Sequence, residues 1–366
     1  MSLDPGFRAW PQRWIVVAGA WVVLGGCSSL RYAVHVAHGQ FDLLASRRPI
    51  TAIIADPHTD PGLRERLREA EAARAFASDR LDLPRNRSYT RYVELHRPYV
   101  TWSVFATPEF SVDPLTHCFP FAGCVAYLGF FDRAHAEREA ARLAKRGDDT
   151  AIEGVAAYST LGWFADPILS SMLRWSDAEL DGVIFHELAH QKLYVKDDSA
   201  FNESYATFVQ EQGLREWRAA RVAVGSDAPA RTRDAPFTRL VLDLRERLRV
   251  LYASGQPAAR LRAAKQEQFA AFRERYAALR ASGSAGGAGE DAWVAAPLNN
   301  AKLVPFGLYD RWVDAFAQLF RMAGGNWPDF HARVARLARL PRAPREKQLA
   351  ELAAQAAAER SAATPR

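Results

Sequence analysis

Apolar and polar positions alternate with two different periods along the chain, and together they predict a fold of helices and strands. Helical spacing of the apolar positions covers residues 32–44, 63–77 and 134–146. Runs of β-branched and aromatic residues, typical of strands, cover residues 99–105, 125–130 and 151–159. A loop at 160–167 leads into an apolar helical segment that contains no Gly or Pro from residue 183 to 196.

The second half of the chain is almost entirely helical in pattern. Residues 232–253 and 258–282 predict a long helical hairpin, and residues 283–289 (GSAGGAG) read as a low-complexity linker. Residues 299–324 carry an aromatic stripe typical of a buried helix face, whereas the Ala-rich end past Pro344 is expected to fray. The expected fold class is therefore α+β and mostly helical.

The beginning of the chain predicts an export signal. The apolar run IVVAGAWVVL at residues 15–24 has the length of a signal-peptide core and is shorter than the about 20 residues of a membrane-spanning helix. LGGC at 24–27 resembles a bacterial lipobox, in which Cys27 becomes the lipidated first residue; a leader with an ordinary cysteine is the alternative. We expect a lipid-anchored, periplasm-facing protein of the bacterial cell envelope. Ser28, in place of an Asp after the cysteine, favours the outer membrane by resemblance to bacterial lipoproteins.

Charge and the remaining cysteines narrow the picture further. The net charge of +6 comes from arginines spread along predicted helices, without an aromatic and basic stripe, so no nucleic-acid partner is expected. Cys118 and Cys124, in CFPFAGC, are expected to form a disulfide in an exported protein, with two buried free thiols as the alternative. Closure of so short a loop stabilises by roughly 2 kcal/mol.

Residues 185–190 (FHELAH) contain the motif HExxH. Residues four apart on a helix share a face, so His186 and His190 can direct imidazole nitrogens at one ion. Glu187 lies beside that face, where its carboxylate can take a proton from a water activated by zinc. The motif predicts one Zn²⁺ ion and a hydrolase; two buried histidines without a ligand role are the alternative.

Catalytic zinc needs a third protein ligand. Glu203 is preferred, because Asn202 can cap a second helix and the carboxylate would then lie in its first turn. Gly213 is expected to end that helix, and Glu211 just before it is the alternative ligand. Four other histidines have no partner at ligand spacing and are not expected to bind metal: His58, His117, His135 and His331.

Several segments resemble the family of bacterial lipoproteins named putative aminopeptidases. The segments are AYSTLGWFADP (157–167), IFHELAHQKLYV (184–195), FNESYATFV (201–209), CFPFAGCVAYLGFF (118–131) and LNNA (298–301). The resemblance implies a gluzincin-like zinc peptidase in which His186, His190 and Glu203 hold the metal. It also implies a zincin-like core with a small sheet beside the HExxH helix. Gluzincins often carry an orienting Asp where this chain has Thr207, and their amine-binding Gly-x-Met-Glu-Asn block is not found here.

The sequence as a whole predicts a zinc-dependent peptidase, of the aminopeptidase type, with Glu187 as general base. Of the phenols that could stabilise the oxyanion, Tyr158 is preferred over Tyr205 and Tyr309. An envelope endopeptidase and a non-catalytic scaffold stabilised by zinc are the alternatives. The expected partners are a peptide substrate and the membrane. The expected parts are a signal peptide, an α/β part, a catalytic core, a helical part and an Ala/Arg-rich tail, at residues 1–26, 27–150, 151–215, 216–340 and 341–366.

Overall fold

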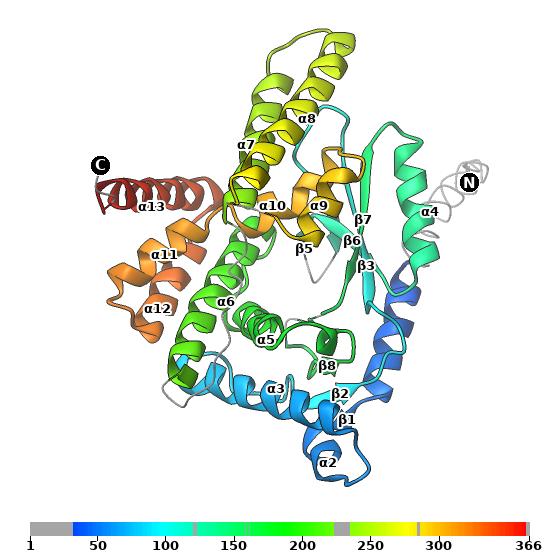
Figure 1. The fold of residues 1–366 in the computed structure, drawn as a ribbon, viewed down its shortest axis with the longest axis vertical. Coiled ribbons are helices and arrows are strands. Elements are labelled where there is room, and N and C mark those ends of the chain that lie inside the picture. Colours follow the sequence, from blue (N-terminus) through cyan, green and yellow to red (C-terminus); the bar gives the residue numbers. More distant parts are fainter. Residues whose placement is uncertain are drawn as a thin grey trace, which may run out of the picture. The chain divides into compact units, whose positions relative to one another are not determined.

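The computed structural model describes the chain in two units (Figure 1). The described residues are 32–119, 123–157, 159–160, 162–222, 235–283 and 286–363. Residues 32–45 of the first unit form the expected helix, and the second unit begins at Arg47. None of the helices in these ranges has both the length and the apolar character needed to cross a membrane. The signal peptide and Cys27 lie outside the described residues, and the finer domain boundaries stay a prediction.

The second unit is α+β and mostly helical, as predicted. Its strands are β1 Arg48–Pro49, β2 Arg91–Val93, β3 Thr101–Thr107, β4 His117–Phe119, β5 Gly123–Val125, β6 Tyr127–Phe130, β7 Asp149–Val155 and β8 Ile168–Leu169. Its α-helices are α2 Ile50–Ala55, α3 Pro61–Arg80, α4 Arg133–Ala144, α5 Asp177–Lys192, α6 Ser199–Val222, α7 Ala235–Tyr252, α8 Ala258–Ala281, α9 Ala288–Ala295, α10 Val304–Tyr309, α11 Val313–Met322, α12 Trp327–Ala338 and α13 Arg342–Ala363. The 3₁₀ turns are η1 Met172–Arg174 and η2 Ala301–Leu303.

The largest antiparallel sheet has the order β6-β3-β7 and is built around the apolar run TWSVFAT. Helix α4 packs against β3 and β7, while Phe105 and Ala126 join Val304 and Leu308 in a separate apolar cluster. β3 is therefore buried along almost its whole length. The single strand expected at 125–130 is divided at Ala126, because β5 pairs with β4 and β6 pairs with β3. Two smaller sheets have the orders β1-β2-β8 and β4-β5.

The LNNA segment (298–301) connects helices α7 and α8 to this sheet through buried polar contacts. The backbone N–H of Asn300 donates to Asp149 of β7, and its side-chain amide donates to the carbonyl oxygen of Glu109. The Tyr252 hydroxyl donates to the Asn300 side-chain oxygen, and buried Lys265 donates to Asp149 at 2.6 Å. Because a buried polar group is costly unless it is paired, this network fixes how α7, α8 and η2 meet β7. The segment has a structural role.

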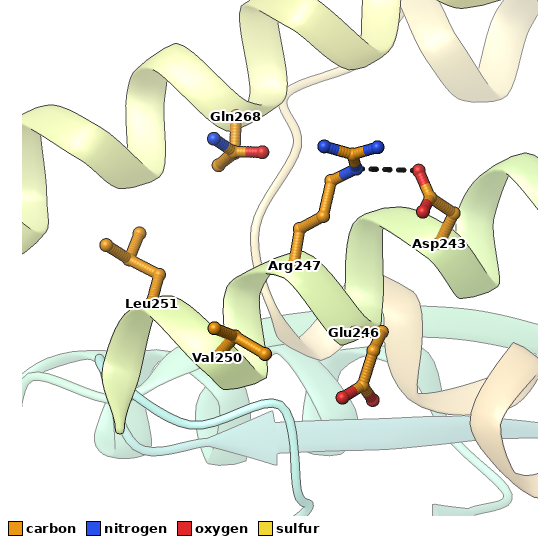
Figure 2. Close-up of a pocket in the computed structure, with 6 residues that line it drawn as sticks. All are labelled: Asp243, Glu246, Arg247, Val250, Leu251 and Gln268. Atoms are coloured by element: carbon orange, nitrogen blue, oxygen red, sulfur yellow. Dashed lines mark hydrogen bonds and ion pairs between the residues drawn. The ribbon is translucent and has the colours of Figure 1, made fainter. Parts of the chain in front are cut away.

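The helical hairpin predicted after residue 231 is present as α7 and α8, which run side by side (Figure 1). Its core is aromatic and includes Phe237, Phe269 and Phe272. Figure 2 shows side chains of this hairpin that line a groove, among them Asp243 and Arg247, which pair at 2.8 Å on α7. The groove shares no residue with the HExxH segment.

The expectation that the Ala-rich end frays is wrong. Residues 345–363 belong to α13, which packs against α11 and α12. Leu349 and Ala356 are fully buried and lie seven residues apart, which places them on one face of the helix. Arg345, one turn before Leu349, is buried in an ion pair with Asp198 at 2.7 Å. The alanines allow close packing, and Arg345 adds a buried charged contact that a hydrophobic pattern does not reveal.

A buried carboxyl group on α5 gives a test of stability against pH. Asp181 is 2% exposed and accepts a hydrogen bond from Trp217 of α6 at 2.8 Å. Burial, together with the nearby carboxylate of Glu69 on α3, raises the pKa of Asp181 to about 8, although Arg221 opposes this. The folded protein therefore keeps a proton that the unfolded chain releases above about pH 4. The contribution of this proton to stability is full below about pH 4 and is lost as the pH rises to about 8.

Asp181→Asn is expected to stabilise the protein at pH 8 by on the order of 1–2 kcal/mol, because the amide needs no proton to stay neutral. At pH 4 the variant and the wild type should melt together. Thermal unfolding at the two pH values measures the difference. An equal shift at both would show that Asp181 does not carry the buried proton.

Candidate metal centre

Helix α5 carries the HExxH motif, and its start is fixed by local sequence. The Ser176 side chain accepts from the Glu179 N–H, and the Glu179 carboxylate accepts from the Ser176 N–H, which forms a capping box. Asp177 and Glu179 also place negative charge at the helix N-terminus. The helix is buried around most of its circumference and ends at Lys192, so the predicted buried helix is confirmed.

Helix α6 follows after six residues, but not with the predicted ends. Asp198 caps it by accepting from the Phe201 N–H at 3.1 Å. Asn202 lies inside the first turn, where its amide bonds the backbone N–H and C=O of Val195, both at 2.7 Å. The predicted cap at Asn202 is therefore wrong, because this side chain ties down the preceding connection. The predicted end at Gly213 is also wrong, since α6 continues to Val222.

Two glycines let α5 and α6 pack closely. A Cβ on Gly213 would lie 2.7 Å from the Leu81 side chain and 3.0 Å from the Phe185 ring, so any side chain there would force these neighbours to move. A Cβ on Gly182 of α5 would lie 2.9 Å from Leu214 and 3.1 Å from Gln210 of α6. Glycine is common just after the last turn of a helix because it has no side chain, so Gly213 resembles a helix end in the sequence. Here the same lack of a side chain allows close packing.

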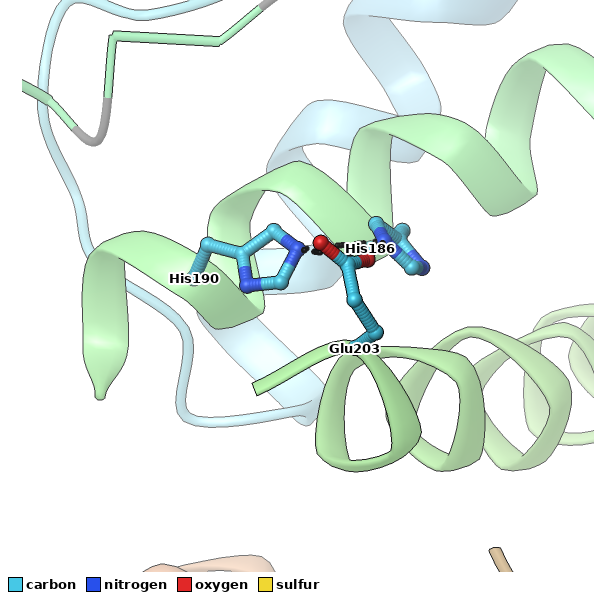
Figure 3. A group of neighbouring side chains, drawn as sticks. All are labelled: His186, His190 and Glu203. Atoms are coloured by element: carbon cyan, nitrogen blue, oxygen red, sulfur yellow. Dashed lines mark hydrogen bonds and ion pairs between the residues drawn. The ribbon is translucent and has the colours of Figure 1, made fainter. Parts of the chain in front are cut away.

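This packing brings His186, His190 and Glu203 together (Figure 3). The two imidazole Nε2 atoms are 3.1 Å apart, and the Glu203 Oε2 atom lies 3.2 Å from Nε2 of His186 and 3.4 Å from Nε2 of His190. Both histidines are less than 8% exposed. Three potential ligand atoms from two helices therefore meet at one buried point.

The three residues fit a zinc ion by type and spacing. Zinc in proteins is held by imidazole, carboxylate and thiolate, and bonds of about 2.0–2.2 Å place tetrahedral ligand atoms about 3.3–3.6 Å apart. The observed separations of 3.1–3.4 Å are close to this range. Burial raises the pKa of Glu203, but the two imidazoles outweigh burial and hold the pKa well below its ordinary value. The carboxylate is therefore ionised and able to act as a ligand.

Glu211, the alternative third ligand, is not in this group. It lies on α6 two turns beyond Glu203, and the group of potential metal ligands within 4.8 Å of one another in the described part of the chain is His186, His190 and Glu203. The geometry therefore favours Glu203 over Glu211.

The side chain of Gln210 contacts the nitrogen of one candidate ligand that faces away from the other two. Its Oε1 lies 3.1 Å from Nδ1 of His186. Sequence reasoning considered Thr207 for this position and missed Gln210. A helical signal was present, since Gln210 lies seven residues after Glu203 and so on the same face of α6.

Glu187 is half-buried beside two further acidic groups that the motif does not predict. Burial, with the charge of Glu187, raises the pKa of Asp166 to about 6, although hydrogen bonds from Thr160 oppose this. Burial and the charges of Glu187 and Asp166 raise the pKa of the Tyr89 hydroxyl well above 10. Tyr89 has a left-handed backbone with φ of 61°, and its N–H donates to the Asp166 carbonyl. An unusual backbone of this kind at a large aromatic residue is typical of functional sites.

The three phenols considered for oxyanion stabilisation have different surroundings. Tyr158 lies outside the described residues. Tyr205 is fully buried, and its hydroxyl bonds Nδ1 of His331 at 2.8 Å, while Nε2 of His331 bonds the Leu81 carbonyl. Tyr205 thus belongs to the core. Tyr309 stacks on the His186 ring at 5.9 Å between centroids, so it lies beside the candidate metal ligands.

A protein-family model described as "Putative aminopeptidase" matches residues 31–349. The chain belongs to this family. The family's description indicates a peptidase, whose substrates would be peptides. No curated protein and no solved structure matches the chain.

In this member of the aminopeptidase family, two aromatic side chains are exposed directly after Gly162, which lies against the HExxH helix. Trp163 is 72% and Phe164 is 46% exposed. The preceding Gly162 lies against the side chain of Gln191, which directly follows His190. Gln191 is itself held by Asn86 at 2.7 Å.

The predicted disulfide between Cys118 and Cys124 is confirmed. The two cysteines face each other across the β4–β5 hairpin. The Cys124 N–H donates to the carboxylate of Asp197 at 2.6 Å, and Asp197 lies in the connection between α5 and α6. In this member of the aminopeptidase family, the β4–β5 hairpin is thus hydrogen-bonded to the segment between His190 and Glu203.

Proposed function

We propose that this protein is a zinc-dependent peptidase of the aminopeptidase type with a zincin-like core. The observation that carries the proposal is the meeting of His186, His190 and Glu203 within hydrogen-bonding distance, with Glu187 next to the first of them in the sequence. Membership of a family described as aminopeptidases supports the reaction class. We also propose that the chain is an envelope lipoprotein anchored at Cys27, on the lipobox-like sequence alone.

In this proposal His186, His190 and Glu203 would hold the ion. Zinc bound there would supply a Lewis acid for the scissile carbonyl and would acidify water. Glu187 removes the proton from the attacking water and returns it to the leaving amine.

The first test is bound metal measured together with peptide hydrolysis, using substrates with free and with blocked amino termini. Glu187→Gln is the control, since the amide cannot take a proton. We expect about one equivalent of zinc in both proteins and a loss of turnover of about 10²–10⁴-fold in the variant. Preference for free amino termini would identify an aminopeptidase.

Faster cleavage of blocked peptides would instead identify an endopeptidase. Stoichiometric zinc without turnover that depends on Glu187 would contradict a catalytic role and favour a scaffold. A wild-type protein without bound metal after zinc loading would contradict the proposal at its first step.

A further inference from the structure

We propose that Gln210 is a positioning residue of the metal centre, which holds His186 with its Nε2 atom directed at Glu203 and His190. The inference rests on the proposed function only in taking the three residues as metal ligands. Gln210 Oε1 lies 3.1 Å from Nδ1 of His186, while Nε2 of the same ring lies 3.2 Å from Glu203 and 3.1 Å from His190. One ring thus has a different neighbour on each nitrogen.

The two contacts of the His186 ring fix its chemistry. A neutral imidazole carries one N–H, and the nitrogen without it is the one that can bind a metal. When the Gln210 oxygen accepts from Nδ1–H, the lone pair stays on Nε2, which points at the other two ligands. Gln210 therefore selects the tautomer that can act as a ligand and sets the orientation of the ring.

The amide of Gln210 is itself held in place by the helix packing. Its Cγ and Nε2 atoms lie 3.2 and 3.1 Å from the point that a Cβ on Gly182 would occupy, so the side chain rests on bare backbone of α5. Gln210 and Glu203 are seven residues apart on α6 and so share a face. One face of one helix thus supplies both the third ligand and the partner that orients the first.

The second histidine lacks this support. The Nδ1 atom of His190 is buried and has no hydrogen-bond partner among the side chains and backbone that the structure describes. Loss of the Gln210 amide is therefore expected to act directly on His186, and on His190 only through the contact between the two rings. A general loosening of α6 would affect both rings and Glu203 together.

Gln210, the hydrogen-bond partner of His186, is a neutral amide, so it brings no charge to the group of proposed ligands. Among His186, His190 and Glu203, the carboxylate is that of Glu203. Gln210 adds a hydrogen-bond acceptor without adding a second negative charge. An acceptor of this kind orients the ring without strongly increasing its basicity. Gln210→Glu keeps an acceptor at the same place and adds charge, whereas Gln210→Met keeps the length of the side chain and removes the acceptor.

The experiment uses the full-length protein and Zn²⁺ as the probe. Nitrogen NMR of the metal-free protein reports the His186 tautomer, and competition with a chelator reports zinc affinity. We expect Nδ1–H at His186 in the wild type. Gln210→Met should mix the tautomers at His186 and weaken zinc binding about 10–100-fold. Gln210→Glu should retain Nδ1–H at His186.

Gln212→Met is the matched control, since Gln212 lies on the same helix and bonds Arg215 and Glu216 away from the ligands. It should leave both the tautomer and the zinc affinity unchanged. A His186 that carries Nε2–H without Nδ1–H in the metal-free wild type would overturn the proposal without any variant, even if Gln210→Met failed to fold. Zinc affinity of a folded Gln210→Met within about twofold of wild type would overturn it as well. Absence of zinc binding in the wild type would instead contradict the proposed function.

Discussion

Glu203→Gln is expected to lose zinc, while Glu211→Gln is expected to keep it. Both changes remove one negative charge from α6 and preserve side-chain volume, so the pair is matched. Glu203 Oε2 lies 3.2 and 3.4 Å from the two imidazole Nε2 atoms, and an amide is not among the usual zinc ligands. The loss at Glu203 should exceed the roughly 10–100-fold that removal of an orienting partner costs.

The measurement is zinc affinity by chelator competition, together with thermal unfolding with and without zinc. Zinc should raise the melting temperature of the wild type and of Glu211→Gln, because a ligand that binds only the folded state stabilises it. It should not raise that of Glu203→Gln. Loss of the zinc effect in Glu211→Gln, with retention in Glu203→Gln, would reverse the assignment of the third ligand.

Arg345→Met is expected to destabilise the protein by about 3–5 kcal/mol, because it leaves the carboxylate of Asp198 buried without its partner. Two guanidinium nitrogens of Arg345 bond Asp198 Oδ2 at 2.7 and 3.0 Å, and both side chains are less than 7% exposed. Asp198 also caps α6 through the Phe201 N–H. The variant should therefore weaken the start of the helix that carries Glu203.

Denaturant unfolding measures the effect, and two variants make it specific. Arg342→Met on the same helix removes a guanidinium that is 64% exposed and pairs with Glu346, so it should cost about 1 kcal/mol or less. Asp198→Asn combined with Arg345→Met removes both charges but keeps a cap, and should recover part of the loss. Equal effects of Arg345→Met and Arg342→Met would contradict the importance of burial here.

Local patterns predicted the parts of the fold that depend on local physics. The spacing of His186 and His190 requires one helix face, and an apolar context makes that helix buried, as α5 is. Glu203 followed from the need for a third ligand on the next helix, and the structure places it beside both histidines. The helical hairpin followed from periodicity and from the Ser-Gly-Gln-Pro break between α7 and α8.

The failures concern residues whose role is set by distant neighbours. Gly213 has the appearance of a helix end, and only its contact with Leu81 shows that it is a packing position. Asn202 has the appearance of a cap, but its partner is the backbone of Val195 in the preceding connection. Nothing near Tyr89 in the sequence indicates its left-handed backbone. The role of such a residue is decided by what the rest of the chain places against it.

The positions of the three proposed ligands along the chain have a consequence for the order of folding. His186 and Glu203 are only 17 residues apart, so the loop that must close to bring them together is short and costs little entropy. The ion pair that anchors the start of α6 joins residues 147 apart and needs the last helix of the chain. Contacts of small sequence separation form early and distant ones late. We therefore expect the three ligands to meet before the chain has completed its fold, and to become rigid only when α13 docks.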